Sequence, residues 1–168
     1  MRNSGTNKNI WLFDATCRYT TFEYGLASVP SDVVSLDAVR AMLSATSQAG
    51  RIFPAHELLS ASAPLVKYEV NVTNTGSMDA EDAVLGIMKP PGAGTNGVPL
   101  QQLYAFEKVH VKAGQTVTVQ LYPSLADFTQ VDEAGVRRVH PGQYTFSFGV
   151  EETVAGGGGY TEHTVTMA

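Results

Sequence analysis

Residues 66–73 read Val66-Lys67-Tyr68-Glu69-Val70-Asn71-Val72-Thr73, and this stretch decides the fold class. Apolar side chains occupy its even positions and polar side chains its odd positions. Successive side chains of a β-strand point to opposite faces, so the alternation predicts a strand with one buried face and one solvated face. The strand should end at Asn74-Thr75-Gly76, because Asn and Gly tolerate a positive φ and favour turns.

Further short strands are predicted at regular intervals after this one. The loop Lys89-Pro90-Pro91-Gly92-Ala93-Gly94-Thr95-Asn96-Gly97 breaks the pattern, because two prolines remove backbone donors and three glycines add freedom. Asp132-Glu133-Ala134-Gly135 predicts a hairpin turn. Such connections are too short for crossover helices, so we expect an all-β antiparallel sandwich from about Pro64 to Val150. The predicted strands cover residues 83–88, 103–111, 115–122, 137–139 and 143–150.

One short motif refines this fold class. Gly142-x-Tyr144 opens the last of these strands. In immunoglobulin-like sandwiches a tyrosine at this place forms a tyrosine corner, in which its hydroxyl binds the backbone a few residues upstream. The motif is compatible with an immunoglobulin-like sandwich but does not by itself establish one.

Two flanks surround the strand-rich region, and we divide the chain into an N-terminal extension, residues 1–63, and a sandwich domain, residues 64–168. Within the extension, residues 19–26 predict a strand. Residues 36–47 predict a short helix, with Ser35 as its cap and Gly50 as its stop, although a long linker around the sandwich would give a similar pattern. After the glycine run 156–159, weak alternation over residues 160–167 predicts an edge strand.

Length and charge exclude several classes of protein. The 168 residues suit one ordinary domain, and 43% hydrophobic residues suffice for a buried core. A net charge of -5 with scattered Lys and Arg argues against nucleic-acid partners. The apolar run Ile10–Phe13 is too short for a signal peptide or a membrane span, so we expect no export signal and no membrane partner.

The acidic residues suggest no assembled active site. A glycosidase needs two carboxylates across a cleft, one of them with a raised pKa. Here the carboxylates cluster in or beside predicted turns, where such groups are usually solvated. Asp132-Glu133-Ala134-Gly135 also lacks the alternation of a calcium loop. The clusters are Asp79 with Glu81 and Asp82, Asp132 with Glu133, and Glu151 with Glu152.

The remaining reactive residues point the same way. The histidines lack the paired spacing of zinc ligands, Cys17 has no neighbouring base, and no Gly-x-Ser-x-Gly elbow occurs. Asn71-Val72-Thr73 matches a glycosylation sequon, and Trp11 with exposed tyrosines could stack on sugars, although aromatic residues of an all-β domain are mostly core. We assign no catalytic, cofactor-binding or metal-binding residue and expect no cofactor. The histidines are His56, His110, His140 and His163.

The strand motifs carry a family resemblance. The run Tyr68–Gly76 resembles the opening strand of the fibronectin type III-like domain at the C-terminus of glycoside hydrolase family 3 enzymes. Lys89-Pro90-Pro91 and Phe106-Glu107-Lys108-Val109 look most like the β-xylosidase branch. The resemblance covers about Tyr19 to Val150, and its further matches are Tyr19–Tyr24, Pro99–Val109, Ala113–Gln115, Val131–Arg138, Gly142–Tyr144 and Phe148–Val150.

The resemblance implies a non-catalytic part of such an enzyme. In that family the nucleophilic Asp lies on an N-terminal barrel and the acid/base usually lies on a following α/β sandwich, and neither domain fits into 168 residues. The Phe-Gly-x-Gly-Leu-Ser string that normally precedes Tyr-Thr-Thr-Phe is also absent, and Phe13–Arg18 stands there instead. The family is often secreted, which leaves the location of this chain open.

Three hypotheses follow from these observations. The first is an accessory module that stabilises glycosidase catalytic domains or mediates an interaction, with weak self-association or capping by the N-terminal 60 residues when those domains are missing. The second is a carbohydrate-binding or adhesive module, which predicts a row of exposed aromatic rings on one sheet or in the Pro90–Pro99 loop. The third is a fragment of a β-xylosidase or β-glucosidase that acts only with the missing catalytic domains.

Overall fold

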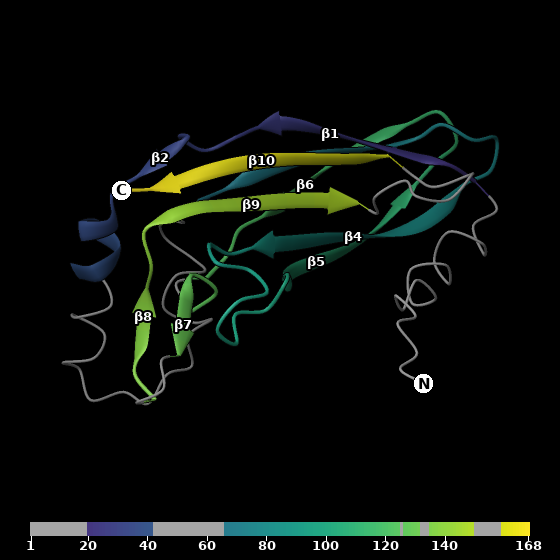
Figure 1. The fold of residues 1–168 in the computed structure, drawn as a ribbon. Coiled ribbons are helices and arrows are strands. Elements are labelled where there is room, and N and C mark those ends of the chain that lie inside the picture. Colours follow the sequence, from purple (N-terminus) through teal and green to yellow (C-terminus); the bar gives the residue numbers. More distant parts are fainter. Residues whose placement is uncertain (1–19, 42–65, 125, 132–134, 150–158) are drawn as a thin grey trace, which may run out of the picture.

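The chain folds into two facing β-sheets and a small separate hairpin (Figure 1). The computed structural model describes residues 20–41, 66–124, 126–131, 135–149 and 159–168. The three-stranded sheet has the order β1 (Phe22–Ser28), β3 (Tyr68–Asn74), β6 (Thr116–Leu121). The five-stranded sheet has the order β2 (Val33–Val34), β10 (Tyr160–Met167), β9 (Gly142–Gly149), β4 (Ala80–Lys89), β5 (Gln102–Val111). The hairpin consists of β7 (Thr129–Val131) and β8 (Arg137–Val139). The predicted all-β, fibronectin type III-like class is confirmed.

The predicted alternation appears directly in the burial of β3. Its even residues are buried and its odd residues are half-buried, so one face of the strand points into the space between the sheets. Strand β9 does the same with Tyr144, Phe146 and Phe148. Hydrophobic burial on both faces of this space drives the two sheets together, at about 25 cal/mol for each Å² of apolar surface removed from water.

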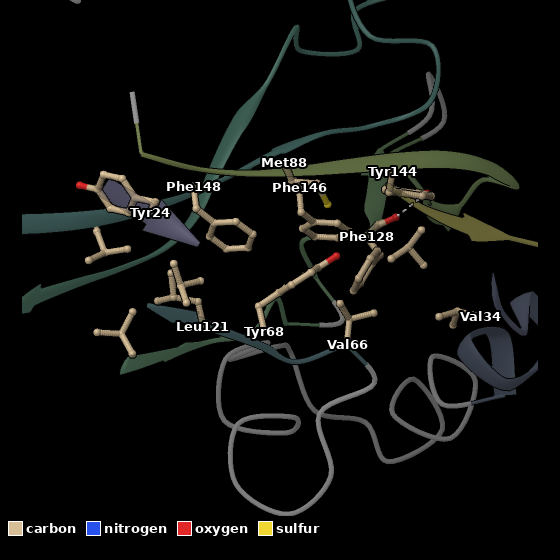
Figure 2. Packing of buried hydrophobic residues seen from close by; sticks show 14 of the residues in the cluster. Tyr24, Val34, Val66, Tyr68, Met88, Leu121, Phe128, Tyr144, Phe146 and Phe148 are labelled. Carbon is tan, nitrogen blue, oxygen red and sulfur yellow. Dashed lines mark hydrogen bonds between the residues drawn. The ribbon is translucent and has the colours of Figure 1, made fainter. Parts of the chain in front are cut away.

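Aromatic rings fill the centre of the core (Figure 2). The ring of Tyr68 on β3 lies 5.2 Å from that of Phe146 and 4.9 Å from that of Phe148, both on the opposite sheet. At one end of the core, Phe128 packs edge to face on Tyr144 at 5.4 Å. Tilted and edge-to-face pairs of this kind contribute beyond their area burial, so these rings join the two sheets.

Tyr144 forms the predicted tyrosine corner. Its hydroxyl donates a hydrogen bond of 2.9 Å to the backbone carbonyl of His140, four residues upstream. The hydroxyl of this buried tyrosine is therefore satisfied at the point where the chain turns into β9.

The Asn74-Thr75-Gly76 turn works by a different mechanism from the predicted one. Neither Asn74 nor Gly76 has a positive φ. Asn74 is instead fully buried, and its side chain makes four hydrogen bonds: Oδ1 accepts from Thr20 Oγ1 (2.6 Å) and the Gly76 N–H (3.1 Å), and Nδ2 donates to the carbonyls of Met78 (2.7 Å) and Val111 (2.9 Å). A Cβ on Gly76 would lie 2.0 Å from Thr20 Oγ1, so glycine is needed for close approach.

Residues before position 64 contribute to both sheets. Strand β1 pairs antiparallel with β3, and the two residues of β2 pair parallel with the end of β10. The parallel pair departs from the expectation of purely antiparallel pairing, and it also gives β10 a neighbour on the side predicted to be an edge. Two strands far apart in sequence can pair in parallel without a crossover helix between them.

A helical segment follows β2. Residues 36–41 are helical, and the remainder of the range 36–47, with Gly50, lies outside the described residues. Ser35 occupies the cap position, where its Oγ accepts a hydrogen bond of 3.4 Å from the Ala38 N–H. Within the described ranges no helix is long and apolar enough to cross a membrane.

Candidate functional site

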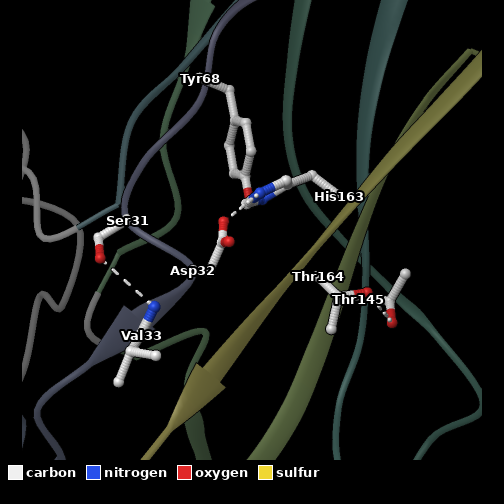
Figure 3. Close-up of polar contacts among 7 residues, drawn as sticks. All are labelled: Ser31, Asp32, Val33, Tyr68, Thr145, His163 and Thr164. Carbon is white, nitrogen blue, oxygen red and sulfur yellow. Dashed lines mark hydrogen bonds and ion pairs between the residues drawn. The ribbon is translucent and has the colours of Figure 1, made fainter.

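A polar relay joins three parts of the chain at one side of the sandwich (Figure 3). The hydroxyl of Tyr68 on β3 lies 3.1 Å from Nδ1 of His163 on β10, and Nε2 of His163 lies 3.0 Å from Oδ1 of Asp32, which precedes β2. The relay runs from a fully buried tyrosine to an aspartate whose side chain is 82% exposed. It therefore connects both sheets to the segment that carries β2.

The order hydroxyl, imidazole, carboxylate resembles that of a nucleophile, its base and an orienting group. Here, however, burial, and then the nearby charge of Asp32, raise the pKa of Tyr68 well above its ordinary value. The phenol keeps its proton and lies inside the core, where no substrate reaches it. The relay therefore acts as a structural connection rather than as catalytic machinery.

The first acidic cluster separates into three unrelated contacts. Asp79 Oδ1 accepts from the Ala113 N–H at 2.9 Å, and Glu81 forms an ion pair with Lys108 across β4 and β5. Asp82 lies in β4, not in a turn, and it is buried with a hydrogen bond from the Tyr24 hydroxyl. The expectation of solvated turn carboxylates is thus wrong for Asp82, because its even position places it on the inner face of the strand.

The other predicted reactive residues form no common site. The structure brings His163 to Asp32 and Tyr68, and within the described part of the chain no three His, Cys, Asp or Glu residues group as metal ligands. Seven of the residues singled out in the sequence lie outside the described ranges, namely Trp11, Cys17, His56, Asp132, Glu133, Glu151 and Glu152.

The predicted row of exposed aromatic rings is also missing from the described residues. Their exposed large aromatics are Phe106 on β5 and Tyr160 on β10. These strands are separated by β4 and β9. The loop Pro90–Pro99 contains no aromatic residue. An aromatic platform for sugars is therefore not present on the described surface.

The loop after β4 instead borders a groove that sequence reasoning did not single out. The groove has a volume of about 430 Å³ and lies beside the first residues of β9. We call it the Pro90 groove. Its lining consists of Lys89, Pro90, Pro91, Gly92, Ala93, Thr95, Gln143 and Thr145.

The outer face of the five-stranded sheet has an apolar part, over β4 and β5. The pairs Leu85–Phe106 and Ile87–Leu103 are register partners and lie on the face turned away from the core. Phe106 is 66% exposed, Leu103 55% and Leu100, just before β5, 72%. We call Leu85, Ile87, Leu100, Leu103 and Phe106 the outer apolar strip.

An irregularity of β5 lies beneath this strip. The register with β4 shifts between Gly86 and Ile87, so Tyr104 is the extra residue of a bulge. A Cβ on Gly86 would lie 2.7 Å from the Tyr104 ring, which therefore needs glycine beneath it. Its hydroxyl is buried without a hydrogen-bond partner among the described residues, and burial raises the pKa of this phenol.

We compared the chain with known sequence families and with curated proteins. Residues 88–151 match the sequence family described as the fibronectin type III-like domain. The chain is 34% identical over 138 residues to β-D-xylosidase 1 of Arabidopsis thaliana, an alignment that covers 78% of this chain and 17% of the relative. A probable exo-1,4-β-xylosidase of Aspergillus fumigatus is 29% identical over 87 residues, covering 51% of this chain and 11% of that protein. The chain thus spans about a sixth or less of the length of these two relatives.

Solved structures agree on the fold. A β-glucosidase from Listeria innocua superimposes with a TM-score of 0.62 at 17% identity, over 89% of this chain and 16% of that one. A GH3 β-glucosidase from Bifidobacterium adolescentis gives a TM-score of 0.58 at 21% identity, over 89% of this chain and 17% of that one. At this level of identity the likeness concerns the fold alone.

Proposed function

Since the chain carries the fibronectin type III-like domain of family 3 glycoside hydrolases, we propose that it is a non-catalytic accessory module that docks on glycosidase catalytic domains and stabilises them. The domain itself is not a catalytic one. The chain matches about a sixth of the xylosidase relative, so most of such an enzyme lies outside it. The substrate class that the relatives suggest is a β-xyloside.

The outer apolar strip is the observation that carries this proposal. Three of its side chains are more than half exposed, and two of these, Phe106 and Leu103, are the register partners of Leu85 and Ile87. Contiguous apolar surface on a folded domain commonly marks a protein interface, since its burial against a partner removes it from water. Trimming all five residues to small polar ones would leave the core untouched, because none of them belongs to the buried cluster.

The edge of β5 argues against one kind of second-copy contact, in which two β5 edges pair. Glu107 is the register partner of the fully buried Val84, so it is an inward-pointing charge on an edge strand. Together with the bulge at Tyr104, such a charge hinders pairing of two β5 edges into one continuous sheet. The outer face of the sheet, which carries the strip, remains accessible to a partner that packs against that face.

A chimera tests the proposal. This chain would replace the C-terminal domain of Arabidopsis β-D-xylosidase 1, and thermal unfolding and nitrophenyl xyloside turnover would be compared with the enzyme truncated before that domain. We expect the chimera to unfold at a higher temperature than the truncated enzyme. The double substitution Leu103→Ser with Phe106→Ser should remove this gain and leave the isolated 168-residue chain folded.

The control is Tyr160→Ser, which removes an exposed aromatic ring from β10 of the same sheet, separated from the strip by β9, and should preserve the gain. An equal loss with Tyr160→Ser, or no effect of the double substitution, would show that the strip is not the docking face. Turnover by the purified isolated chain would contradict a non-catalytic role. A stable dimer of the isolated chain that the strip substitutions dissolve would make a second copy the occupant instead.

A further inference from the structure

The Pro90 groove differs from the outer apolar strip in chemistry. Its hydrogen-bonding groups are the ammonium of Lys89, the amide of Gln143 and the hydroxyls of Thr95 and Thr145. Lys89 and Thr145 are register partners on β4 and β9, so they stand side by side on the outer face of the sheet. A rigid sheet therefore supplies the groove with part of its polar floor, and the loop supplies the wall.

The wall is held in one conformation by its own backbone. The Gly94 N–H donates to the Val98 carbonyl at 3.0 Å, and the Val98 N–H donates to the Thr95 carbonyl at 2.8 Å. Thr95 binds the Gly92 carbonyl through both its N–H (3.0 Å) and its Oγ1 (2.6 Å). Gly92, Gly94 and Gly97 have φ values of 72°, 80° and 79°, which other residues adopt only at a cost. A loop ordered in this way loses little entropy when a ligand binds.

Two contacts fix the wall against its neighbours. Gln130 Nε2 of β7 donates to the Pro91 carbonyl at 3.3 Å. A Cβ on Gly142 would lie 2.9 Å from Pro91 Cβ, so the glycine that opens β9 allows the proline ring to pack there. The position of Pro91 therefore depends on Gly142 and Gln130, and the shape of the groove is part of the fold.

The polar groups of the groove are partly unused within the protein. Among the described residues, no hydrogen bond or ion pair is made by the Lys89 ammonium or by the Gln143 side chain, while Thr145 Oγ1 lies 3.2 Å from Thr164 Oγ1. The carboxylate of Glu162 lies on the same outer face, on β10, and accepts the hydroxyl of Tyr160 at 2.7 Å. Among the described residues Lys89 thus has no ion-pair partner, and the other side chains that line the groove are uncharged.

We propose that the Pro90 groove binds a sugar acid, a polyhydroxylated ring that carries one carboxylate. Lys89 would pair with the carboxylate, and Gln143 and Thr145 would exchange hydrogen bonds with ring hydroxyls, since amide and hydroxyl groups both donate and accept. Thr95 Oγ1 donates its proton to the Gly92 carbonyl and would accept a hydrogen bond from the sugar. The proline rings and glycine backbone offer C–H surface to the sugar ring. A volume of about 430 Å³ lies in the range of small-molecule sites.

The net charge of the chain does not favour binding of an anion, so a preference for a sugar acid would have to arise in the groove. The chain carries a net charge of -5, so its long-range field repels anions. Attraction of a sugar acid must therefore come from direct contact with Lys89. The groove is open and its ligand stays partly hydrated, so we expect binding in the millimolar range, with the charged contact contributing about a tenfold gain in affinity.

Titration of the 168-residue chain with sodium glucuronate, followed by amide nuclear magnetic resonance, tests the proposal. We expect saturable shifts centred on Lys89, Gln143 and Thr145, with glucose and sodium acetate each binding about tenfold more weakly. Lys89→Met should weaken glucuronate to the level of glucose, and Lys89→Arg should preserve the preference for the acid. Lys112→Met, which removes an exposed cation at another loop, serves as the matched control and should change nothing.

Three outcomes would overturn the proposal: no saturable shift at millimolar glucuronate, equal affinity for acetate, or equal weakening by Lys112→Met. All variants keep the core intact, and their amide spectra report folding in the same experiment. The titration involves no catalytic domain, so its result is independent of the docking experiment above, and either proposal can fail alone.

Discussion

Phe146 and Phe106 lie in the same five-stranded sheet and show what its two faces do. Phe146 on β9 points inward and is fully buried, with Tyr68, Tyr104 and Phe128 around it. Phe106 on β5 points outward and is 66% exposed. The same side chain therefore stabilises the fold at one position and is available for binding at the other. The inner face holds the sheets together, and the outer face carries both proposed interaction sites.

Phe146→Ala should produce the largest loss of stability. Truncating a buried phenylalanine removes its transfer free energy and leaves a cavity, which typically costs about 3–5 kcal/mol. Phe106→Ala should cost less than about 1 kcal/mol in the isolated chain, because its ring is already largely in water. Chemical denaturation of both variants measures the difference, and similar losses would contradict the division between the two faces.

A second comparison uses two asparagines of β3. Asn74→Ala removes four hydrogen bonds of a fully buried amide, and the Met78 and Val111 carbonyls lose their donor. We expect the free energy of unfolding to fall by about 3 kcal/mol. Asn71→Ala removes one exposed hydrogen bond from Thr118, with a loss of a few tenths of a kcal/mol, about the scatter of surface substitutions. Urea unfolding measured side by side tests this, and a mild Asn74→Ala effect would mean that water replaces the lost bonds.

Tyrosines give a third, smaller contrast. Tyr144→Phe loses the tyrosine corner at about 1 kcal/mol, whereas Tyr160→Phe loses an exposed bond to Glu162 and should cost less. Thermal unfolding at neutral pH distinguishes the two variants. Equal effects would indicate that the corner adds no stability here.

The Tyr144 phenol also predicts how the free energy of unfolding changes at alkaline pH. Burial raises the pKa of Tyr144 to about 12, above its ordinary value of 10.0. Because the phenol ionises at lower pH in the unfolded chain, its contribution to the free energy of unfolding should be fully present below pH 10. This contribution should fall as the pH rises toward 12. Unfolding titrations across this window would show a shallower fall for Tyr144→Phe, and an unchanged slope would contradict the assignment.

The smallest expected effect lies wholly on the outer face. The hydrogen bond and charge of Lys108 lower the pKa of the exposed Glu81. The contribution of this pair should therefore be present above the ordinary pKa of a glutamate and be lost as the pH falls through the lowered value. A double-mutant cycle with Glu81→Gln and Lys108→Met should give a small coupling that salt removes, and a salt-independent coupling would argue against an exposed pair.

Much of the sandwich could be predicted from local patterns. The alternation in residues 66–73 identified the inner face of β3, and Tyr144, Phe146 and Phe148 identified that of β9. Gly142-x-Tyr144 indicated the place of a tyrosine corner, and the structure shows its bond to the His140 carbonyl. These features follow from a period of two residues or from contacts four residues apart, which a single stretch of sequence contains.

The site features were less predictable. The Pro90 groove forms because the loop after β4 lies beside the start of β9. The outer apolar strip depends on the register of β4 with β5. Gly142 gave no signal that its missing Cβ makes room for Pro91. Such features depend on which strands become neighbours.

The stretch 66–73 by itself thus determined a strand, its buried face and, with the turns that follow, an all-β sandwich. Only the tertiary structure decided that Asn74 would be a buried hub, that Asp82 would lie under Tyr24, and that Asp32 would meet His163 across 131 residues of sequence. The physical reason is that alternation is a property of the local backbone. Hydrogen-bond partners across a sandwich are fixed by strand order, and strand order results from packing the whole chain into one core.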